Sequence, residues 1–498
     1  MHSVLGYFKK RPHLLILVLI LLIGIFFRTY QVVERFEFAH DGDLYSWIVK
    51  DIIVNHHLRL IGQLTSAPDI FIGGLFYYLL IPFFLTSKID PIGTIYFSII
   101  IGLVTMFSLY FVLSKLFKTE VGLIGAFLYA VLLSTVNTDR WVVPTITTNL
   151  WVAWYFYTVI KISRGDYKIL PLLGILIALI WHIHIALIPT LIAVPAAILF
   201  AKKIPNLKQI THFFITFFVT SLPLIVFEVK EGFGQTFSLI DNFTATRDGA
   251  TGLYKLTSVL NMVSKNITAL FFKPQSFNPT FNTIFVVIIL LTSFWLIKKK
   301  VLLKKELAVF FIWIAGVIAF FGFSSSPISE YYFSNIEIVF LCLVSLVFYI
   351  LFKSSSIGKV LSIGILILIL LKNSYFMITQ DYYHKGYVEK KAVVDYITND
   401  ARIKNLPCFS INYITAPGEN AGFRYFFYLK NAKLAVAGRG SPVYNIVIPD
   451  EYALNEVKIK FGHIGIIPPK EIGPNETIKE ACSGQNTNLT EPLFGYVE

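Results

Sequence analysis

Residues 13–33, HLLILVLILLIGIFFRTYQVV, decide what class of protein this is. A run of about 20 mostly apolar residues is long enough for a helix to cross a hydrocarbon core roughly 30 Å thick. Basic residues 9–11 precede the run, and no small-residue cleavage site follows it. We therefore interpret it as a retained first membrane span rather than a signal peptide.

The composition of the 498 residues agrees with this interpretation. Hydrophobic residues make up 55% of the chain and charged residues only 15%, and the mean hydropathy is +0.67. Soluble domains average about a quarter charged residues, so a soluble enzyme, a disordered chain and a disulfide scaffold are excluded. Basic residues outnumber acidic ones by 43 to 30. They lie between apolar runs, so we expect no nucleic-acid partner.

Further apolar runs continue as far as residue 378 and predict a polytopic α-helical membrane protein with about eleven transmembrane helices. We expect these spans near residues 13–33, 92–113, 121–136, 149–162, 169–183, 185–200, 208–228, 281–297, 306–323, 331–352 and 357–378. Residues 1–380 would form this membrane domain. Residues 381–498 have a soluble composition and predict a small mixed α/β domain, with a helix over 388–397 and strands near 408–414, 425–429 and 444–448.

The distribution of basic residues predicts the orientation. Alternate short connections hold eighteen Lys and Arg residues, whereas the short connections on the opposite side hold Arg140 alone. The positive-inside rule then places the N-terminus in the cytoplasm and the C-terminal domain outside a plasma membrane. Residue usage favours a prokaryotic source.

Two long segments fall on the external side. Segment 34–91 contains the apolar stretch 71–85. If this stretch were a span, every later cluster of Lys and Arg would fall on the opposite side of the membrane. We therefore expect a re-entrant or interfacial helix there. Segment 229–280 contains an apolar periodicity over 253–272 that predicts an amphipathic helix in the membrane interface, with a lid over a lipid substrate as the sharper hypothesis. Long ordered segments of this kind are more often functional than idle.

Ionisable residues at membrane ends are functional candidates, because placing a charge in the bilayer costs about 2.5–3.5 kcal/mol on insertion scales. The candidates all map to the predicted external face, although loop faces also collect polar residues for no catalytic reason. They are Asp41, Asp43, Asp139, Arg140, His182, His184, Glu228, Lys230, Arg247 and Glu330, with Tyr331 and Tyr332 beside the last.

Two carboxylates in His40-Asp41-Gly42-Asp43 follow the first span. Asp41 and Asp43 could hold a divalent cation, or Asp41 could act as a general base. The alternative is an acidic cap on a helix that begins near Leu44. We expect no cofactor, with the cation left open.

This region resembles the GT-C glycosyltransferases, and most closely the group of dolichyl-phosphate-mannose-protein mannosyltransferases and aminoarabinose transferases. The similarity lies in the first span, the long external loop with Asp41 and Tyr45, the continuation Lys50-Asp51-Ile52, the segment Gly74-x-x-Tyr77-Tyr78, and the later Glu330-Tyr331-Tyr332-Phe333. The chain departs from those families at Gly42, where they commonly have Glu, and at Gly73-Gly74, where they have Pro-Pro.

The resemblance implies an extracytoplasmic enzyme that transfers a sugar from a polyprenyl-phosphate donor to a protein, lipid or cell-envelope glycan. It implies that Asp41 is the essential acidic residue, with Tyr45, Tyr77 and Tyr331 at the substrate. Membrane lipids and an external acceptor would be the partners. No Walker-type phosphate loop is present, in keeping with a lipid-linked donor.

Arg140 is the best candidate to bind the donor phosphate, because a guanidinium binds phosphate in a planar fork. Lys230 and Arg247 compete for this role, and each could instead anchor to lipid headgroups. Glu228 could orient the acceptor or pair with Lys230.

His182 and His184 lie two residues apart, so on a helix they point about 200° away from each other. They therefore do not predict a zinc pair, and we expect His184 to be the one that lines the site.

A transporter or flippase is the main alternative function, since it shares many spans and a few buried charges. Such proteins usually contain two related halves with sites at mid-membrane depth, and the sequence has no such repeat. A lipid-linked polymer ligase fits the early Asp41 loop less well. Cys408 and Cys482 could form a disulfide if the C-terminal domain is outside.

Overall fold

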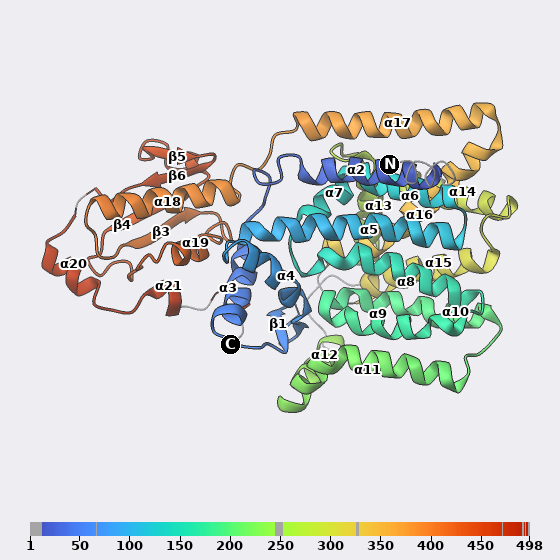
Figure 1. Cartoon of the computed structure of the whole chain (residues 1–498), viewed down its shortest axis with the longest axis horizontal. Coiled ribbons are helices and arrows are strands. Elements are labelled where there is room, and N and C mark those ends of the chain that lie inside the picture. Colours follow the sequence, from blue (N-terminus) through green and yellow to red (C-terminus); the bar gives the residue numbers. More distant parts are fainter. Residues whose placement is uncertain are drawn as a thin grey trace, which may run out of the picture.

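The computed structural model describes residues 12–65, 67–244, 252–324, 328–470, 472–490, 493, 495 and 496. Figure 1 shows a large helical bundle joined to a small α/β domain. Within the described residues, seven helices are long and apolar enough to cross a membrane, and a bent pair adds an eighth. The seven are α2 (Pro12–Thr29), α5 (Thr94–Leu116), α11 (Leu207–Lys230), α14 (Pro279–Lys298), α15 (Lys304–Phe323), α16 (Ser334–Ser354) and α17 (Ser356–Thr379). The bent pair is α6 (Thr119–Val131) with α7 (Leu133–Arg140), at an angle of 66°.

All eleven predicted spans are helical in the described structure, and seven or eight of these helical segments are long and apolar enough to cross a membrane. The other three correspond to α8 (Thr148–Ser163), to η3 (Tyr167–Ile169) with α9 (Leu170–Ile183), and to η4 (Ile185–Ile192) with α10 (Ala193–Ala201). Pro189 lies inside η4. Because proline removes a backbone donor and clashes with the preceding turn, it interrupts regular α-helix here.

The apolar stretch 71–85 is not one continuous helix, contrary to the prediction. Its first part is strand β2 (Phe71–Gly73), which pairs antiparallel with β1 (Ile61–Leu64). Its second part is α4 (Leu75–Thr86), whose 12 residues are too few to span a bilayer at about 1.5 Å per residue. A side chain at Gly73 would collide with the His182 ring. The close approach of this ring therefore requires glycine at position 73.

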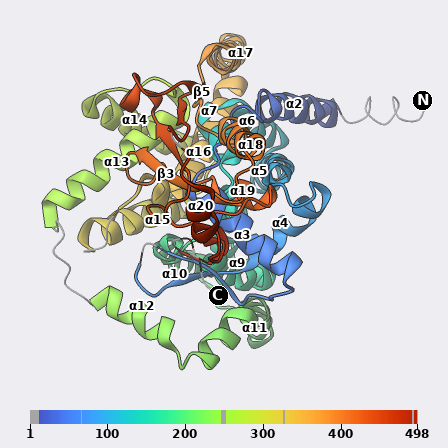
Figure 2. The ribbon, with the colours of Figure 1, turned by 90° about the vertical axis from the view of Figure 1, so that its left-hand side faces the viewer.

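The second predicted external segment forms two helices, α12 (Gly234–Thr244) and α13 (Gly252–Phe272). Figure 2 shows α12 beside α11 and α13 beside α14, on different sides of the bundle. The α13 helix is amphipathic as predicted. It buries Val259, Val263 and Ile267 in the bundle core and exposes Leu253 and Tyr254.

The C-terminal domain packs α18 (Tyr387–Ile403) against a four-stranded sheet of order β3-β4-β6-β5. The β3 (Ser410–Thr415) and β4 (Val443–Ile448) strands are parallel, and β6 (Ile464–Ile467) is antiparallel to both β4 and β5 (Ile459–Phe461). The expected strand at 425–429 is instead helix α19 (Arg424–Leu429). Its aromatic residues favour a strand locally. Tyr425, Phe426 and Phe427 are all buried, however, whereas successive side chains of a strand point to opposite faces. Shorter elements η6 (Asp450–Ala453), α20 (Asn475–Ala481) and α21 (Thr487–Thr490) complete the domain.

Cys408 and Cys482 form a disulfide across a sequence separation of 74 residues, so the pairing left open above is present. Closing a loop of this size restricts the unfolded chain, and such bonds typically contribute about 2–4 kcal/mol. We therefore expect reduction, or Cys482→Ser, to lower the unfolding temperature of the C-terminal domain in the full-length detergent-solubilised protein. An unfolding transition that is insensitive to reductant would contradict this expectation.

Candidate functional site

Helix α3 (His40–Val54) begins directly after the loop that follows α2, and Figure 1 shows it with α4 between the bundle and the C-terminal domain. Asp41 lies in its first turn, where the helix dipole favours a negative charge. The Gln63 amide, from β1, donates to Asp41 Oδ1 at 3.2 Å. Among the described residues, Asp41 Oδ2 has no hydrogen-bond partner. One oxygen is therefore held while the other remains able to accept a proton.

Tyr77 extends this network. Its hydroxyl donates to Gln63 Oε1 at 3.0 Å and accepts from the Gln63 backbone N–H at 3.1 Å. Burial raises the pKa of Tyr77, and the Asp41 charge acts in the same direction. The phenol therefore stays protonated and fixes the Gln63 amide that holds Asp41. The sequence gives no sign of this role for Gln63, because its position depends on the pairing of β1 with β2.

Tyr45 and Tyr77, both expected at the substrate, are buried. Tyr45 is 1% exposed, packs against Phe76 and Phe84, and has its hydroxyl 3.3 Å from Thr94 Oγ1. Tyr45 is a core residue, whereas Tyr77 acts through Gln63.

Asp43 faces the C-terminal domain rather than Asp41. Its carboxylate is 0% exposed and accepts hydrogen bonds from the backbone N–H of Tyr425 at 2.9 Å and of Gly422 at 3.4 Å. Burial raises the pKa of Asp43, opposed by those two hydrogen bonds and by Arg424 and Lys390. On one helix, residues two apart point in nearly opposite directions. The structure therefore does not bring Asp41 and Asp43 together as a cation site, and Asp43 attaches α3 to the C-terminal domain.

Lys390 on α18 strengthens this attachment. Its ammonium donates to the carbonyl oxygens of Phe38 and Ala421, both at 2.7 Å. The Tyr387 backbone N–H donates to the Phe36 carbonyl at 2.9 Å. The C-terminal domain thus binds the loop from which the Asp41 helix starts.

Asp139 is fully engaged inside the bundle. Its Oδ2 accepts from Arg28 Nε at 2.8 Å and lies 2.6 Å from Arg28 Nη2, while its Oδ1 accepts from the Tyr129 hydroxyl at 2.6 Å. Both charged residues are 1% exposed. Asp139, which the sequence offered as a substrate ligand, therefore joins α2 to α6 and α7, and both of its oxygens are engaged. Arg28 was missed because it lies within the first apolar span.

Arg140 lies at the end of α7. Its Nη2 donates to the carbonyl oxygens of Phe27 and Tyr30, both at 2.7 Å, which satisfies the end of α2. Its Nε is buried without a hydrogen-bond partner, and no carboxylate pairs with it among the described residues. Part of its hydrogen-bonding capacity and its charge are therefore without a partner in the described part of the chain.

His184 lies at the break between α9 and η4, with its Nδ1 accepting from the Ala186 backbone N–H at 3.0 Å. In the neutral ring the proton is then on Nε2, which has no partner among the described residues. The ring packs edge to face on Tyr331 at 5.3 Å and against Tyr332 at 5.1 Å. The rings of His184, Tyr331 and Tyr332 therefore form one cluster at the end of α9. The neighbouring His182 is buried against Gly73 of β2, the strand that pairs with the Gln63 strand β1.

The remaining predicted residues lie in other contacts. Glu228 Oε2 accepts from the Thr236 N–H and hydroxyl and so caps α12, and no ion pair joins it to Lys230, which is exposed. Glu330 forms an exposed ion pair with Lys265 at 2.8 Å. Arg247 lies outside the described residues.

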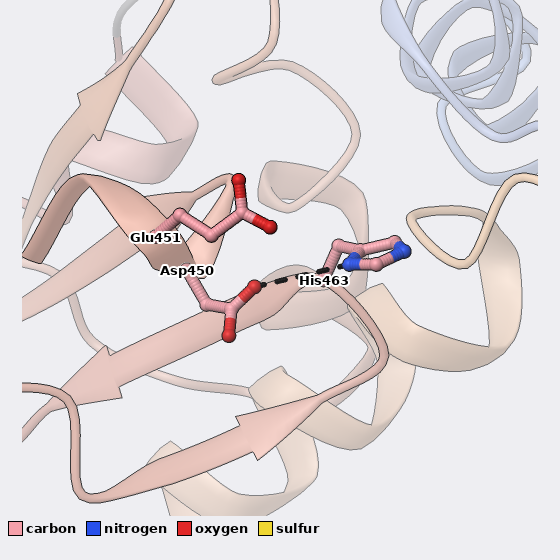
Figure 3. Close-up of side chains that lie close together, drawn as sticks. All are labelled: Asp450, Glu451 and His463. Carbon is pink, nitrogen blue, oxygen red and sulfur yellow. Dashed lines mark ion pairs between the residues drawn. The ribbon is translucent and has the colours of Figure 1, made fainter. Parts of the chain in front are cut away.

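One group in the described chain has the composition of a metal site. Figure 3 shows Asp450, Glu451 and His463, whose ligand atoms all lie within 4.8 Å of one another. The Lys460 ammonium lies 3.6 Å from Asp450 and already offsets its charge. The group belongs to η6 and the β5–β6 turn of the C-terminal domain, apart from α3.

The bundle, the α3–α4 region and the appended α/β domain define a polytopic membrane protein with the GT-C fold. Two solved structures of ArnT from Cupriavidus metallidurans share this fold. The structure bound to undecaprenyl phosphate has a TM-score of 0.60 at 10% identity, over 92% of this chain and 99% of that one. The apo structure has a TM-score of 0.55 at 9% identity, over 94% and 100%.

An oligosaccharyltransferase from Archaeoglobus fulgidus, solved with zinc and sulfate, is less similar. Its TM-score is 0.48 at 12% identity, over 87% of this chain and 68% of that one. The sequence matches no protein-family model and no curated protein. The two ArnT structures thus confirm the predicted GT-C fold. At 10% and 9% identity they show the fold and not the activity.

Proposed function

We propose that this protein is a glycosyltransferase that moves a sugar from a polyprenyl-phosphate donor to an acceptor hydroxyl or amide on the extracytoplasmic face of the membrane. The observation that carries the proposal is the Asp41 carboxylate, with one oxygen held by Gln63 and the other without a partner. The likeness to ArnT, which was solved with undecaprenyl phosphate, supports a lipid-phosphate donor.

Asp41 serves as the general base. Its Oδ2 accepts the acceptor's proton while the acceptor oxygen or nitrogen forms a bond to the anomeric carbon of the sugar. The bond between that carbon and the phosphate oxygen breaks, and its electron pair leaves with polyprenyl phosphate. General-base catalysis of this kind contributes about 10²–10⁴-fold in rate.

Arg140 is our proposed phosphate-binding residue. Its unpaired charge and free Nε can stabilise the negative charge that develops on the leaving phosphate. Its Nη2 contacts with α2 fix the guanidinium, so less conformational freedom is lost when phosphate binds. Lys230 and Arg247 remain alternative phosphate ligands.

The direct test is transfer of radiolabelled sugar by the wild-type protein in proteoliposomes, from a panel of polyprenyl-phosphate hexoses and pentoses. Acceptors would be membrane extracts, and parallel samples would contain a chelator to test for a cation. We expect at least one donor to be consumed. Failure of every donor with folded protein would overturn the proposal.

Gln63 gives a second, independent prediction. Gln63→Leu keeps the side-chain size but removes the amide that orients Asp41, so we expect kcat to fall roughly 10- to 100-fold with little change in donor KM. Tyr77→Phe, which leaves Gln63 in place without its hydroxyl partner, should have a smaller effect in the same direction. The control is Gln485→Leu, an exposed glutamine in the C-terminal domain. A kcat for Gln63→Leu equal to that of the control would show that the network does not position the base.

A further inference from the structure

Trp141 immediately follows Arg140 and is an exposed aromatic residue at the end of α7. It ends α7 in an extended conformation, with φ −85° and ψ 99°. Its side chain is 42% exposed, although the neighbouring Val142 and Val143 are buried. Among the described residues its indole N–H has no hydrogen-bond partner. The exposed indole thus has both an open apolar surface and an unused donor.

Tyr331 lies beside Trp141 and connects it to the Asp41 region. The two rings meet edge to face with centroids 6.5 Å apart, and Tyr331 is itself 36% exposed. His184 packs on Tyr331, and helix α9, which ends beside His184, contacts β2, the strand paired with the β1 strand whose Gln63 holds Asp41. Two exposed aromatic rings therefore lie side by side: Trp141 follows the proposed phosphate-binding residue in the chain, and Tyr331 packs on His184.

This order matches the chemistry of the donor. In a polyprenyl-phosphate sugar the phosphate is bonded directly to the anomeric carbon, so the sugar must lie next to whatever binds the phosphate. Arg140 turns toward the end of α2, and Trp141 is its neighbour in the chain. An aromatic ring offers a flat apolar surface with a polar edge, and a sugar ring has apolar C–H faces ringed by hydroxyl groups. The indole N–H and His184 Nε2–H can donate to those hydroxyls.

We infer that Trp141 and Tyr331 form the platform that binds the sugar ring of the donor, between Arg140 and Asp41. This inference rests on the proposed function and assigns the part of the donor that each residue contacts. It also predicts that the protein distinguishes a polyprenyl-phosphate sugar from bare polyprenyl phosphate. An aromatic residue that only anchored the protein in the lipid interface would not make that distinction.

The test compares binding of two labelled lipids to full-length protein in nanodiscs: polyprenyl phosphate, and the same lipid carrying the hexose or pentose that the transfer assay consumes. Wild type should bind the sugar-bearing lipid more tightly. Trp141→Ala should weaken binding of that lipid roughly 2- to 10-fold and leave bare polyprenyl phosphate unchanged. Trp141→Phe should keep most of the preference, because it keeps a ring. The matched control is Tyr375→Ala, since Tyr375 is an aromatic residue of α17 with 63% exposure.

Several outcomes would overturn the inference. These are equal weakening of both lipids by Trp141→Ala, no effect on either lipid, or a wild type that binds the two lipids equally. If wild type consumes a donor and yet shows one of these results, only the platform is wrong. If wild type consumes no donor and binds neither lipid, the proposed function fails as well.

Discussion

Asp41→Asn should reduce sugar transfer by about 10²–10⁴-fold while donor binding stays close to that of wild type. Asparagine keeps the size of the side chain and can still accept from Gln63, so the 3.2 Å contact that holds the side chain is preserved. It cannot take up the proton of an acceptor. The measurement is single-turnover transfer from a saturating donor, together with equilibrium binding of the same donor.

Asp381→Asn is the control for this variant. Asp381 is 82% exposed and lies between α17 and α18, so the substitution removes a carboxylate without touching α3. We expect its transfer rate to equal that of wild type. An Asp41→Asn protein as active as this control would remove Asp41 from the mechanism.

Arg28→Met should destabilise the membrane bundle by about 3–5 kcal/mol, because it leaves Asp139 charged and without its cation in a buried position. Arg28 also donates to the Ala130 and Tyr129 carbonyl oxygens, at 3.1 and 3.2 Å, so three elements lose contacts at once. The measurement is thermal unfolding of the detergent-solubilised protein.

The double variant Arg28→Met with Asp139→Leu tests the cause of that loss. Replacing both charges with apolar groups removes the uncompensated carboxylate, so much of the lost stability should return. An Arg28→Met protein as stable as wild type would contradict the account of this ion pair. A double variant less stable than the single one would contradict it as well.

The sequence predicted what depends on local pattern. Apolar length located all eleven helical segments. The capping alternative for the Asp41 pair expected a helix from near Leu44, whereas α3 begins at His40 and has Asp41 in its first turn. The later clusters of Lys and Arg predicted that segment 71–85 is not a span, because a span there would move them to the other side of the membrane. The α4 helix in this segment is indeed too short to span a bilayer. These inferences require only neighbours in the chain.

What the sequence could not predict depends on distant pairing. Asp139 and Arg28 are separated by 111 residues, and Asp43 finds its partner Tyr425 382 residues away. An isolated carboxylate in a loop gives no sign of whether it will be buried by such a partner or left open to substrate. Gln63 reaches Asp41 only because β1 and β2 form a hairpin beside α4. The candidate set therefore mixed residues held in structural contacts with residues that the proposed chemistry uses.

The fate of a doubly labelled donor tests the central claim most directly. Wild-type proteoliposomes would receive a polyprenyl-phosphate sugar with one label in the sugar and another in the lipid. We predict that the sugar label moves to the acceptor while bare polyprenyl phosphate appears in equal amount. Movement of both labels across the bilayer in one intact molecule, with no sugar transferred, would contradict the claim and identify a lipid-linked sugar transporter instead.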